Sequence, residues 1–241
     1  MEREYINGAI NLHLSGPSPI LYLDLSAHDK IIRLNPNKEW EIGCETFNTF
    51  HKIYNITETE NNKLTFYQEQ NALPKNVNFP PGAYEVAEII KYVHENKDAK
   101  EAQIELTINK HNHTITMYSP THIIDLTSDN SVGYLLGFTK QTIPAGKKIQ
   151  SDTNVKIFPV QSIMGKCNAC DSGSEDIIFY FTLTTPPGQI IVYERPQIQF
   201  YRVKYKEING VTLRICDQDG NLLKNHGEIY NAFVVIREVH N

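Results

Sequence analysis

Apolar and polar residues alternate along most of the chain, which is the pattern of β-strands with one buried face. Ile10, Leu12 and Leu14 alternate with polar residues, a Gly-Pro-Ser-Pro run interrupts them, and a similar alternation follows. The same period recurs in the second half of the chain. It predicts strands at residues 10–14, 21–25, 31–34, 64–67, 103–109, 114–118, 177–184, 190–193, 198–205, 211–216 and 233–239.

One pair of these strands forms the clearest hairpin. Residues 103–109 and 114–118 are separated by Lys-His-Asn at 110–112, which supplies the turn.

Two further local elements are expected after the hairpin. A short helical turn should begin within residues 125–131 and end at Gly137, and a loop should cover residues 140–153.

A single helix is predicted over residues 84–95. It follows Pro-Pro-Gly, and Glu85 and Glu88 lie in its early turns, where carboxylates suit the positive end of the helix dipole. Its apolar residues share one face at helical spacing: Val86, Ile89, Ile90 and Val93.

Many strands between turn signals, with one good helix, favour an all-β fold. We expect a single jelly-roll sandwich with an inserted α-helix and a β-hairpin sub-core. The 241 residues suit one domain, 1–241, with the helix-containing insertion at about 58–140. With 40% hydrophobic residues, the chain has enough apolar material for a sizeable core.

Charge and terminal features restrict the classes of partner. The formal net charge of −5 gives no long-range attraction for nucleic acid, and no apolar run is long enough to span a membrane. The first residues do not resemble a signal peptide, so we expect no secretion by that route. Four cysteines are too few for a disulfide framework, which favours a reducing compartment.

A Cys-x-x-Cys pair is the first candidate for chemistry. Cys167 and Cys170 supply at most two of the four ligands of a structural zinc, and Cys44 and Cys216 stand alone. A metal site, an adventitious disulfide and two ordinary thiols all remain open, and two ordinary thiols is the preferred interpretation. No βαβ pattern surrounds the pair, which disfavours a redox role.

The histidines give no recognisable site. His111, His113 and His122 lie around the predicted hairpin without the helical spacing of a zinc enzyme, while His13 and His28 have no visible partner.

Other motifs have equally simple interpretations. Asp217 and Asp219 belong to an Asp-Gln-Asp-Gly turn rather than a catalytic or calcium-binding pair. Asn55 and Asn112 begin Asn-x-Thr sequences, which we interpret as chance matches to the glycosylation sequon. No nucleophile elbow or phosphate loop is present, so the sequence predicts no catalytic, cofactor-binding or metal-binding residues.

The aromatic strands suggest an interface between subunits. Residues 177–184 place Phe179 and Phe181 on one face and Tyr180 on the other, and we expect Tyr201 and Tyr205 to share one side of their strand. Such tyrosines suit either a subunit interface or a sandwich core with ordinary surface tyrosines. Under the first interpretation, Tyr201→Glu weakens association and leaves the fold intact.

A compact apolar segment at residues 134–138 interrupts two polar loops. We expect Tyr134, Leu135, Leu136 and Phe138 to cover the hairpin and the apolar helix face, closing a small sub-core over the sandwich. Gly133 and Gly137 would allow close backbone approach or a positive φ.

Several segments in a fixed order resemble one family, the minor capsid protein of Polinton (Maverick) elements and the related adintoviruses. The resemblance covers about residues 38–239, although 167–174 matches no family motif. The segments are WEIGCETFNTF at 40–50, KLTFY at 63–67, PGAYEV at 81–86, GYLLGF at 133–138 and ICDQDGNL at 215–222.

The resemblance implies a penton: a single jelly roll that forms homopentamers at the vertices of an icosahedral virion. It implies a double-jelly-roll major capsid protein as partner, assembly inside the host cell, and no catalytic residues. The competing hypothesis is a receptor-binding spike or fibre-head module of similar architecture. An enzyme is disfavoured, because a jelly-roll oxygenase needs a His-x-Asp/Glu pair on an inward-facing strand, and none of the predicted strands contains one.

Overall fold

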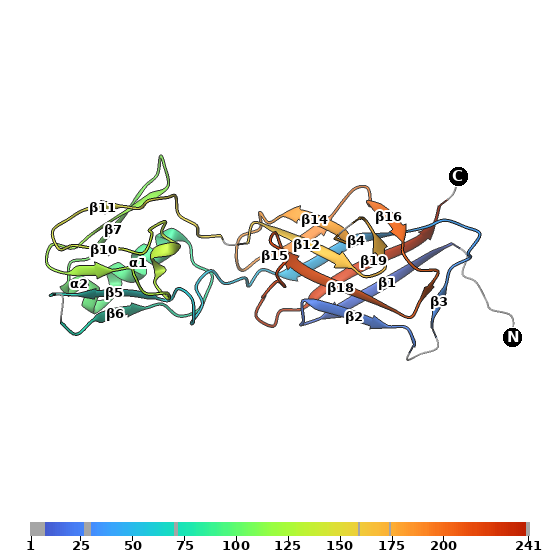
Figure 1. Ribbon diagram of the computed structural model, residues 1–241, viewed down its shortest axis with the longest axis horizontal. Coiled ribbons are helices and arrows are strands. Elements are labelled where there is room, and N and C mark those ends of the chain that lie inside the picture. The colour runs from blue at the N-terminus through green and yellow to red at the C-terminus, as the bar shows by residue number, and fades with distance from the viewer. Residues whose placement is uncertain (1–7, 27–29, 70–71, 159, 174, 240–241) are drawn as a thin grey trace. The chain divides into compact units, whose positions relative to one another are not determined.

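The computed structural model describes residues 8–26, 30–69, 72–158, 160–173 and 175–239 (Figure 1). The chain forms two compact units. Unit 1 comprises residues 1–53 and 160–241, and unit 2 comprises residues 54–159. The interval predicted for the insertion, about 58–140, falls inside unit 2, which continues to residue 159. That the whole chain is one domain stays a prediction.

Unit 1 is built of β-strands. They are β1 (Ala9–Gly16), β2 (Ile20–Asp24), β3 (Ile32–Arg33), β4 (Trp40–Phe50), β12 (Ser162–Cys167), β13 (Cys170–Asp171), β14 (Ile177–Thr182), β15 (Ile190–Glu194), β16 (Phe200–Val203), β17 (Glu207–Ile208), β18 (Gly210–Asp217) and β19 (Tyr230–Glu238).

Two antiparallel sheets of unit 1 form a sandwich. One has the order β1-β19-β4, after which β15 and β16 both pair with β4 and β13 pairs with β16; the other has the order β14-β12-β18-β2. When β15 and β16 are counted as one interrupted strand, the first sheet takes the first, eighth, third and sixth principal strands. The second sheet takes the fifth, fourth, seventh and second. This is the strand order of a jelly roll, and it confirms the predicted all-β sandwich.

The core of unit 1 lies between the inner faces of these sheets. Phe47 of β4 is fully buried, with its ring centroid 5.2 Å from that of Phe179 on the opposite sheet. Phe181 and Tyr193 extend this aromatic layer, their centroids 5.3 Å apart. Each fully buried aromatic side chain contributes roughly 2–3 kcal/mol of transfer free energy.

The central strand β4 is absent from the sequence-predicted strands, and a β-bulge explains why. Val234 of β19 pairs with Cys44 and the preceding Phe233 pairs with Thr46, so Glu45 is the extra residue. Before the bulge, the alternating buried positions are Trp40, Ile42 and Cys44. After the bulge, the next buried position is Phe47, so the period of two is interrupted. β12 was also missed; its register shifts between Gly165 and Lys166.

Unit 2 has its own elements and its own core. They are β5 (Lys63–Tyr67), β6 (Lys75–Asn78), α1 (Val86–Glu95), α2 (Lys97–Glu101), β7 (Glu105–Asn109), β8 (Thr114–Tyr118), β9 (Ile123–Asp125), a 3-10 turn (Val132–Tyr134), β10 (Thr142–Ile143) and β11 (Ile149–Gln150). The sheets are ordered β10-β9-β5-β6 and β11-β8-β7, and α1 buries Ile89 and Val93 against this core.

Several local predictions for unit 2 need correction. The helix begins at Val86 rather than 84, and Glu88 accepts a hydrogen bond from the Glu85 backbone N–H at 2.7 Å. Asn96 is extended and ends α1; its side chain then accepts the Ala99 N–H and begins α2. The helical turn expected to begin within 125–131 and to end at Gly137 is only a 3-10 turn at Val132–Tyr134. The expected loop at 140–153 contains β10 and β11.

The apolar segment at 134–138 enters the core of unit 2, with one exception. Leu135, Leu136 and Phe138 are buried there, but Tyr134 is 63% exposed and lies beneath the Lys156 ammonium, so its predicted role in the core is wrong. Gly137 has a φ of +84°, and a Cβ at this position would lie 2.2 Å from the Thr153 carbonyl oxygen. Glycine is therefore required there, as expected.

A buried asparagine joins the beginning and end of unit 2. The Asn55 Nδ2 donates to the carbonyls of Tyr84 and Ile157, each at 2.7 Å, and its Oδ1 accepts the Tyr84 N–H at 2.9 Å. The amide is fully hydrogen-bonded, which makes this sequon asparagine unavailable for modification in the folded chain.

A second buried asparagine fixes the end of β4 in unit 1. The Asn225 Nδ2 donates to Thr49 Oγ1 at 2.9 Å and to the Phe50 carbonyl at 2.6 Å, and its Oδ1 accepts the Lys52 N–H at 2.8 Å. The loop before β19 is thereby held against the strand that leads out of the sandwich.

Candidate functional site

The four cysteines are all buried and free. Cys44, Cys167 and Cys170 point into the core of unit 1, whereas Cys216 lies outside that cluster. Burial raises the pKa of the Cys167 thiol to about 12 and that of Cys170 to about 11, and it also raises the pKa of Cys44 well above its usual range. Burial therefore favours the neutral thiol, which is a poor nucleophile toward a disulfide.

The histidines do not converge. His111 and His113 lie at the tip of the β7–β8 hairpin, whereas His122 packs against Phe66, with its ring centroid 5.8 Å away. Burial, with a smaller effect of Lys75, lowers the pKa of His122. His13 stacks on Phe233 with centroids 4.4 Å apart, and His28 lies outside the described residues. Within the described ranges, no three His, Cys, Asp or Glu side chains are grouped to hold a metal ion.

The Asp-Gln-Asp-Gly segment forms the predicted turn. Asp217 Oδ1 accepts the backbone N–H groups of Asp219 and Asn221, each at 2.9 Å, and Gly220 has a φ of +83°. The Asp217 carboxylate therefore stabilises the turn. Asn112 likewise accepts the N–H and hydroxyl of Thr114 at the hairpin tip.

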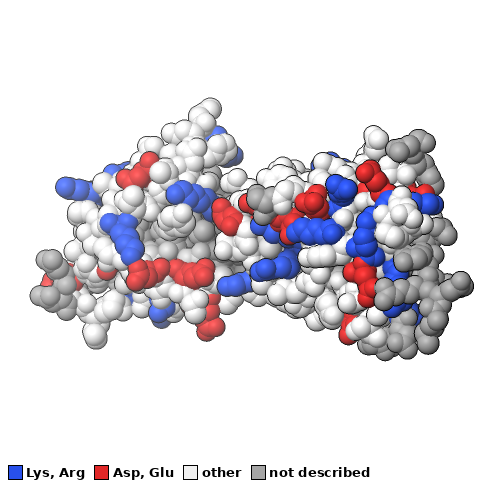
Figure 2. Space-filling view, turned by 45° about the vertical axis from the view of Figure 1, so that its right-hand side comes forward, with Lys and Arg blue, Asp and Glu red and all other residues white. Residues whose placement is uncertain are grey.

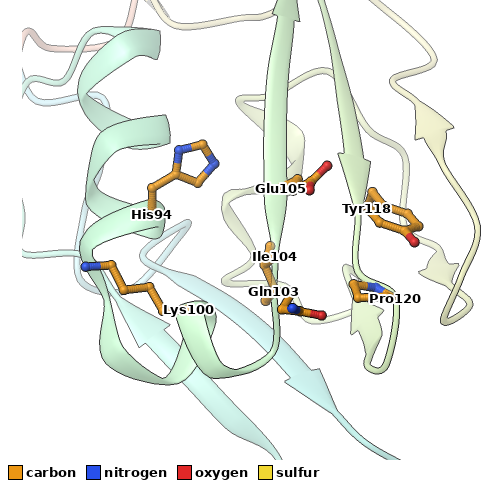
Figure 3. A pocket seen from close by; sticks show the side chains of 7 residues that line it. All are labelled: His94, Lys100, Gln103, Ile104, Glu105, Tyr118 and Pro120. Carbon is orange, nitrogen blue, oxygen red and sulfur yellow. The ribbon is translucent and has the colours of Figure 1, made fainter.

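A pocket of about 550 Å³ lies in unit 2 between α1, α2 and the β7–β8 hairpin (Figure 3). His94 Nε2 is occupied by the Leu106 N–H at 3.2 Å. Figure 3 shows the ammonium of Lys100 extending away from the Glu105 carboxylate, so the two charged ends do not face a common point. The other lining residues are Gln103, Ile104, Tyr118 and Pro120. This arrangement lacks the convergent polar groups of a catalytic or ligand-binding site.

The aromatic strands match the predicted faces only in part. Phe179 is buried and Tyr180 is 47% exposed, as expected. Tyr201, however, packs against the core of unit 1, and burial raises its pKa. Tyr205 lies beyond the end of β16. Tyr201→Glu would therefore place a carboxylate against the core and disturb the fold, so it is not the selective interface variant that the sequence suggested.

Positive and negative side chains are interspersed on the face in Figure 2, without a continuous basic area. No helix in the described part of the chain is long and apolar enough to cross a membrane.

The strand order makes this chain a jelly-roll protein with unit 2 inserted between the third and fourth principal strands. Among solved structures it is similar to the crystal structure of the selenomethionine-labelled mavirus penton protein. The sequence identity is 12%, the match covers 96% of this chain and 99% of that one, and the TM-score is 0.48. No protein-family model and no curated protein matches the sequence.

Sequence reasoning missed two features of the structure, one in the interior and one on the surface. One is the pair of buried asparagines, Asn55 and Asn225, which resemble ordinary turn residues in the sequence. The other is the exposure of Ile190 and Val192 on β15, at 63% and 55%. Alternation predicts a strand at this position, but whether its outer face is covered depends on the strand order.

Proposed function

We propose that this chain is a structural capsid subunit, a penton that forms homopentamers at the vertices of an icosahedral particle. The observation that carries the proposal is the jelly-roll order of unit 1, a fold used in viral shells. Jelly rolls also occur in lectins and cupins, so the fold gives no function by itself. The ordered sequence motifs supply the second support.

Those motifs coincide with the framework of the fold. The segment at 40–50 is β4, a central strand of its sheet, and the segment at 63–67 is β5 of unit 2. The segment at 133–138 enters the core of unit 2, and that at 215–222 contains the end of β18 and the turn after it. The resemblance therefore rests on residues that determine the architecture, which suits a protein whose role is assembly.

In this role the chain is not an enzyme and has no cofactor. Its partners are further copies of itself and a double-jelly-roll major capsid protein, and it binds neither a specific nucleic acid nor a membrane. It is assembled inside the host cell and resides in the virion.

Oligomeric state tests the proposal directly. Mass photometry and negative-stain microscopy of the purified chain, alone and with its major capsid protein, should reveal five-fold rings. A chain that stays monomeric under both conditions would contradict the penton role.

The receptor-binding alternative is supported by one observation. Unit 2 is a compact insertion with its own core, and it exposes Tyr134 and the hairpin tip at 110–113. A spike or fibre head would use these surfaces to bind a host molecule. A clean trimer, together with cell binding by the isolated unit 2, would favour this alternative.

A further inference from the structure

Two opposite edges of one sheet in unit 1 lack a neighbouring strand. In the described part of the chain, β1 pairs only with β19 and β15 pairs only with β4. Edge strands are usually protected by lysine, proline or a bulge. Here β1 contains no Lys, Arg, Asp or Glu, and β15 contains only Glu194. Both edges are therefore open to strand addition.

The backbone of β15 is oriented for such an addition. The Gln189 carbonyl accepts the His51 N–H at 2.8 Å, on the side of β4. Because hydrogen-bonding directions alternate along an antiparallel strand, the N–H and C=O groups of Ile190, Val192 and Glu194 point away from β4. They form an unpaired row beside two exposed apolar side chains.

The neighbouring edge strand of the other sheet is less accessible. The Tyr180 carbonyl in β14 accepts a hydrogen bond from the Arg195 guanidinium at 3.4 Å. This bond occupies an acceptor that an added strand would need. On this side of the sandwich, β15 is therefore the more open edge.

Strand direction makes β1 of a second copy a suitable partner. β1, β19, β4 and β15 are successively antiparallel, so β1 and β15 run in opposite directions within one chain. A copy rotated about an axis parallel to the strands keeps its strand directions, and its β1 then meets β15 antiparallel, as in every other pair of this sheet. Because the contact joins two different surfaces of the same chain, it forms a ring when the rotation between neighbouring copies closes.

Charge is compatible with this pairing. The outward side chains of β1 are Asn11, His13 and Ser15, none of them acidic, so they do not repel Glu194. Registers that place Val192 opposite one of these three residues keep exposed side chains on one face and buried ones on the other.

We propose that β15 of each subunit accepts β1 of the next subunit as an added strand, joining the sheets edge to edge around the ring. This inference rests on the proposed function, which supplies the second copy.

Cysteine cross-linking tests the contact. Val192→Cys is combined in turn with Asn11→Cys, His13→Cys and Ser15→Cys, and the assembled protein is oxidised. At least one pair should give a ladder of covalent multimers on non-reducing gels. The native thiols are buried and should not contribute, and Val192→Cys with Lys97→Cys, in unit 2, should give no ladder.

A backbone variant provides the second test. Val192→Pro removes an N–H that β4 does not use, so it should weaken ring formation at least tenfold while Trp40 fluorescence reports an intact unit 1. Val192→Thr should assemble normally. Rings that form normally with Val192→Pro, or that give no ladder with any cysteine pair, would overturn this inference and leave the penton role standing. A wild-type chain that is always monomeric would overturn both.

Discussion

Asn225, whose side chain is buried, stabilises the end of β4 through three hydrogen bonds. Asn225→Ala leaves the Lys52 N–H and the Phe50 carbonyl without this partner, at a cost of about 2 kcal/mol or more in the unfolding free energy of unit 1. Urea denaturation followed by Trp40 fluorescence measures it, because Trp40 is the only tryptophan and is buried in unit 1. Asn209→Ala, at an exposed position, is the control; equal midpoints for the two variants would contradict the prediction.

Gly137 gives a second prediction at the scale of one residue. Gly137→Ala combines an unfavourable positive φ with a Cβ 2.2 Å from the Thr153 carbonyl oxygen, so we expect a destabilisation of roughly 2 kcal/mol or more in unit 2. Gly146→Ala has a similar φ of +77° and no atom within 4 Å of the Cβ, and therefore isolates the backbone cost. Hydrogen exchange at the Phe138 amide, which donates to Gly133, reports the difference. Equal protection in both variants would show that the close contact is relieved cheaply.

Helices α1 and α2 are separated by a single capping residue. Asn96→Ala removes the side-chain acceptor of the Ala99 N–H and should destabilise α2 by about 1 kcal/mol. Faster amide exchange at residues 99–102, with α1 unchanged, is the expected result, and Asn96→Asp should retain protection. Unchanged exchange in the alanine variant would mean that packing alone holds α2.

The alternation of apolar residues predicted elements of regular period better than those with a local interruption. It located most strands of the sandwich, the β7–β8 hairpin and the apolar face of α1. It missed β4, whose bulge at Glu45 breaks the period, and α2, which buries only Ala99 and so shows little amphipathic pattern. The prediction that Tyr134 lies in the core was wrong, because the pattern of a five-residue apolar segment does not indicate which side chain points to solvent.

The candidate site depends on information that single residues do not carry. That Cys167 and Cys170 face the core follows from their place between the two sheets, and motif spacing does not encode it. The open edges of β1 and β15 likewise follow from strand order, which joins residues far apart in the chain. A sequence pattern identifies an edge strand only after the sheet has been assembled.

At the scale of the whole molecule, unit 1 should be sensitive to alkali. Burial raises the pKa of the thiols Cys44, Cys167 and Cys170 and of the Tyr230 hydroxyl, so the folded state favours their neutral forms. The unfolded chain loses these protons first. The resulting stability is complete below about pH 9, the usual range of a thiol, and is lost as the pH rises through the folded-state values.

Urea midpoints from Trp40 fluorescence between pH 8 and pH 11 should therefore fall with increasing pH. Cys167→Ala should reduce the slope, since one fewer raised thiol titrates. A midpoint independent of pH would contradict this account.

The two units have separate cores, and Asn55 ties the ends of unit 2 together. Residues 54–159 expressed alone should therefore unfold cooperatively, with dispersed amide signals in NMR spectra. Asn55→Ala should lower the midpoint of that fragment. A fragment without dispersed signals would mean that unit 2 needs the sandwich in order to fold.

The hydrogen bond between Asn55 and Ile157 brings the entry and exit of a long insertion within a few ångströms of each other. A jelly roll that accommodates one inserted domain between two closely spaced insertion points should accept other domains whose own termini are adjacent. The junctions near residues 53 and 160 are thus natural places to graft a foreign domain.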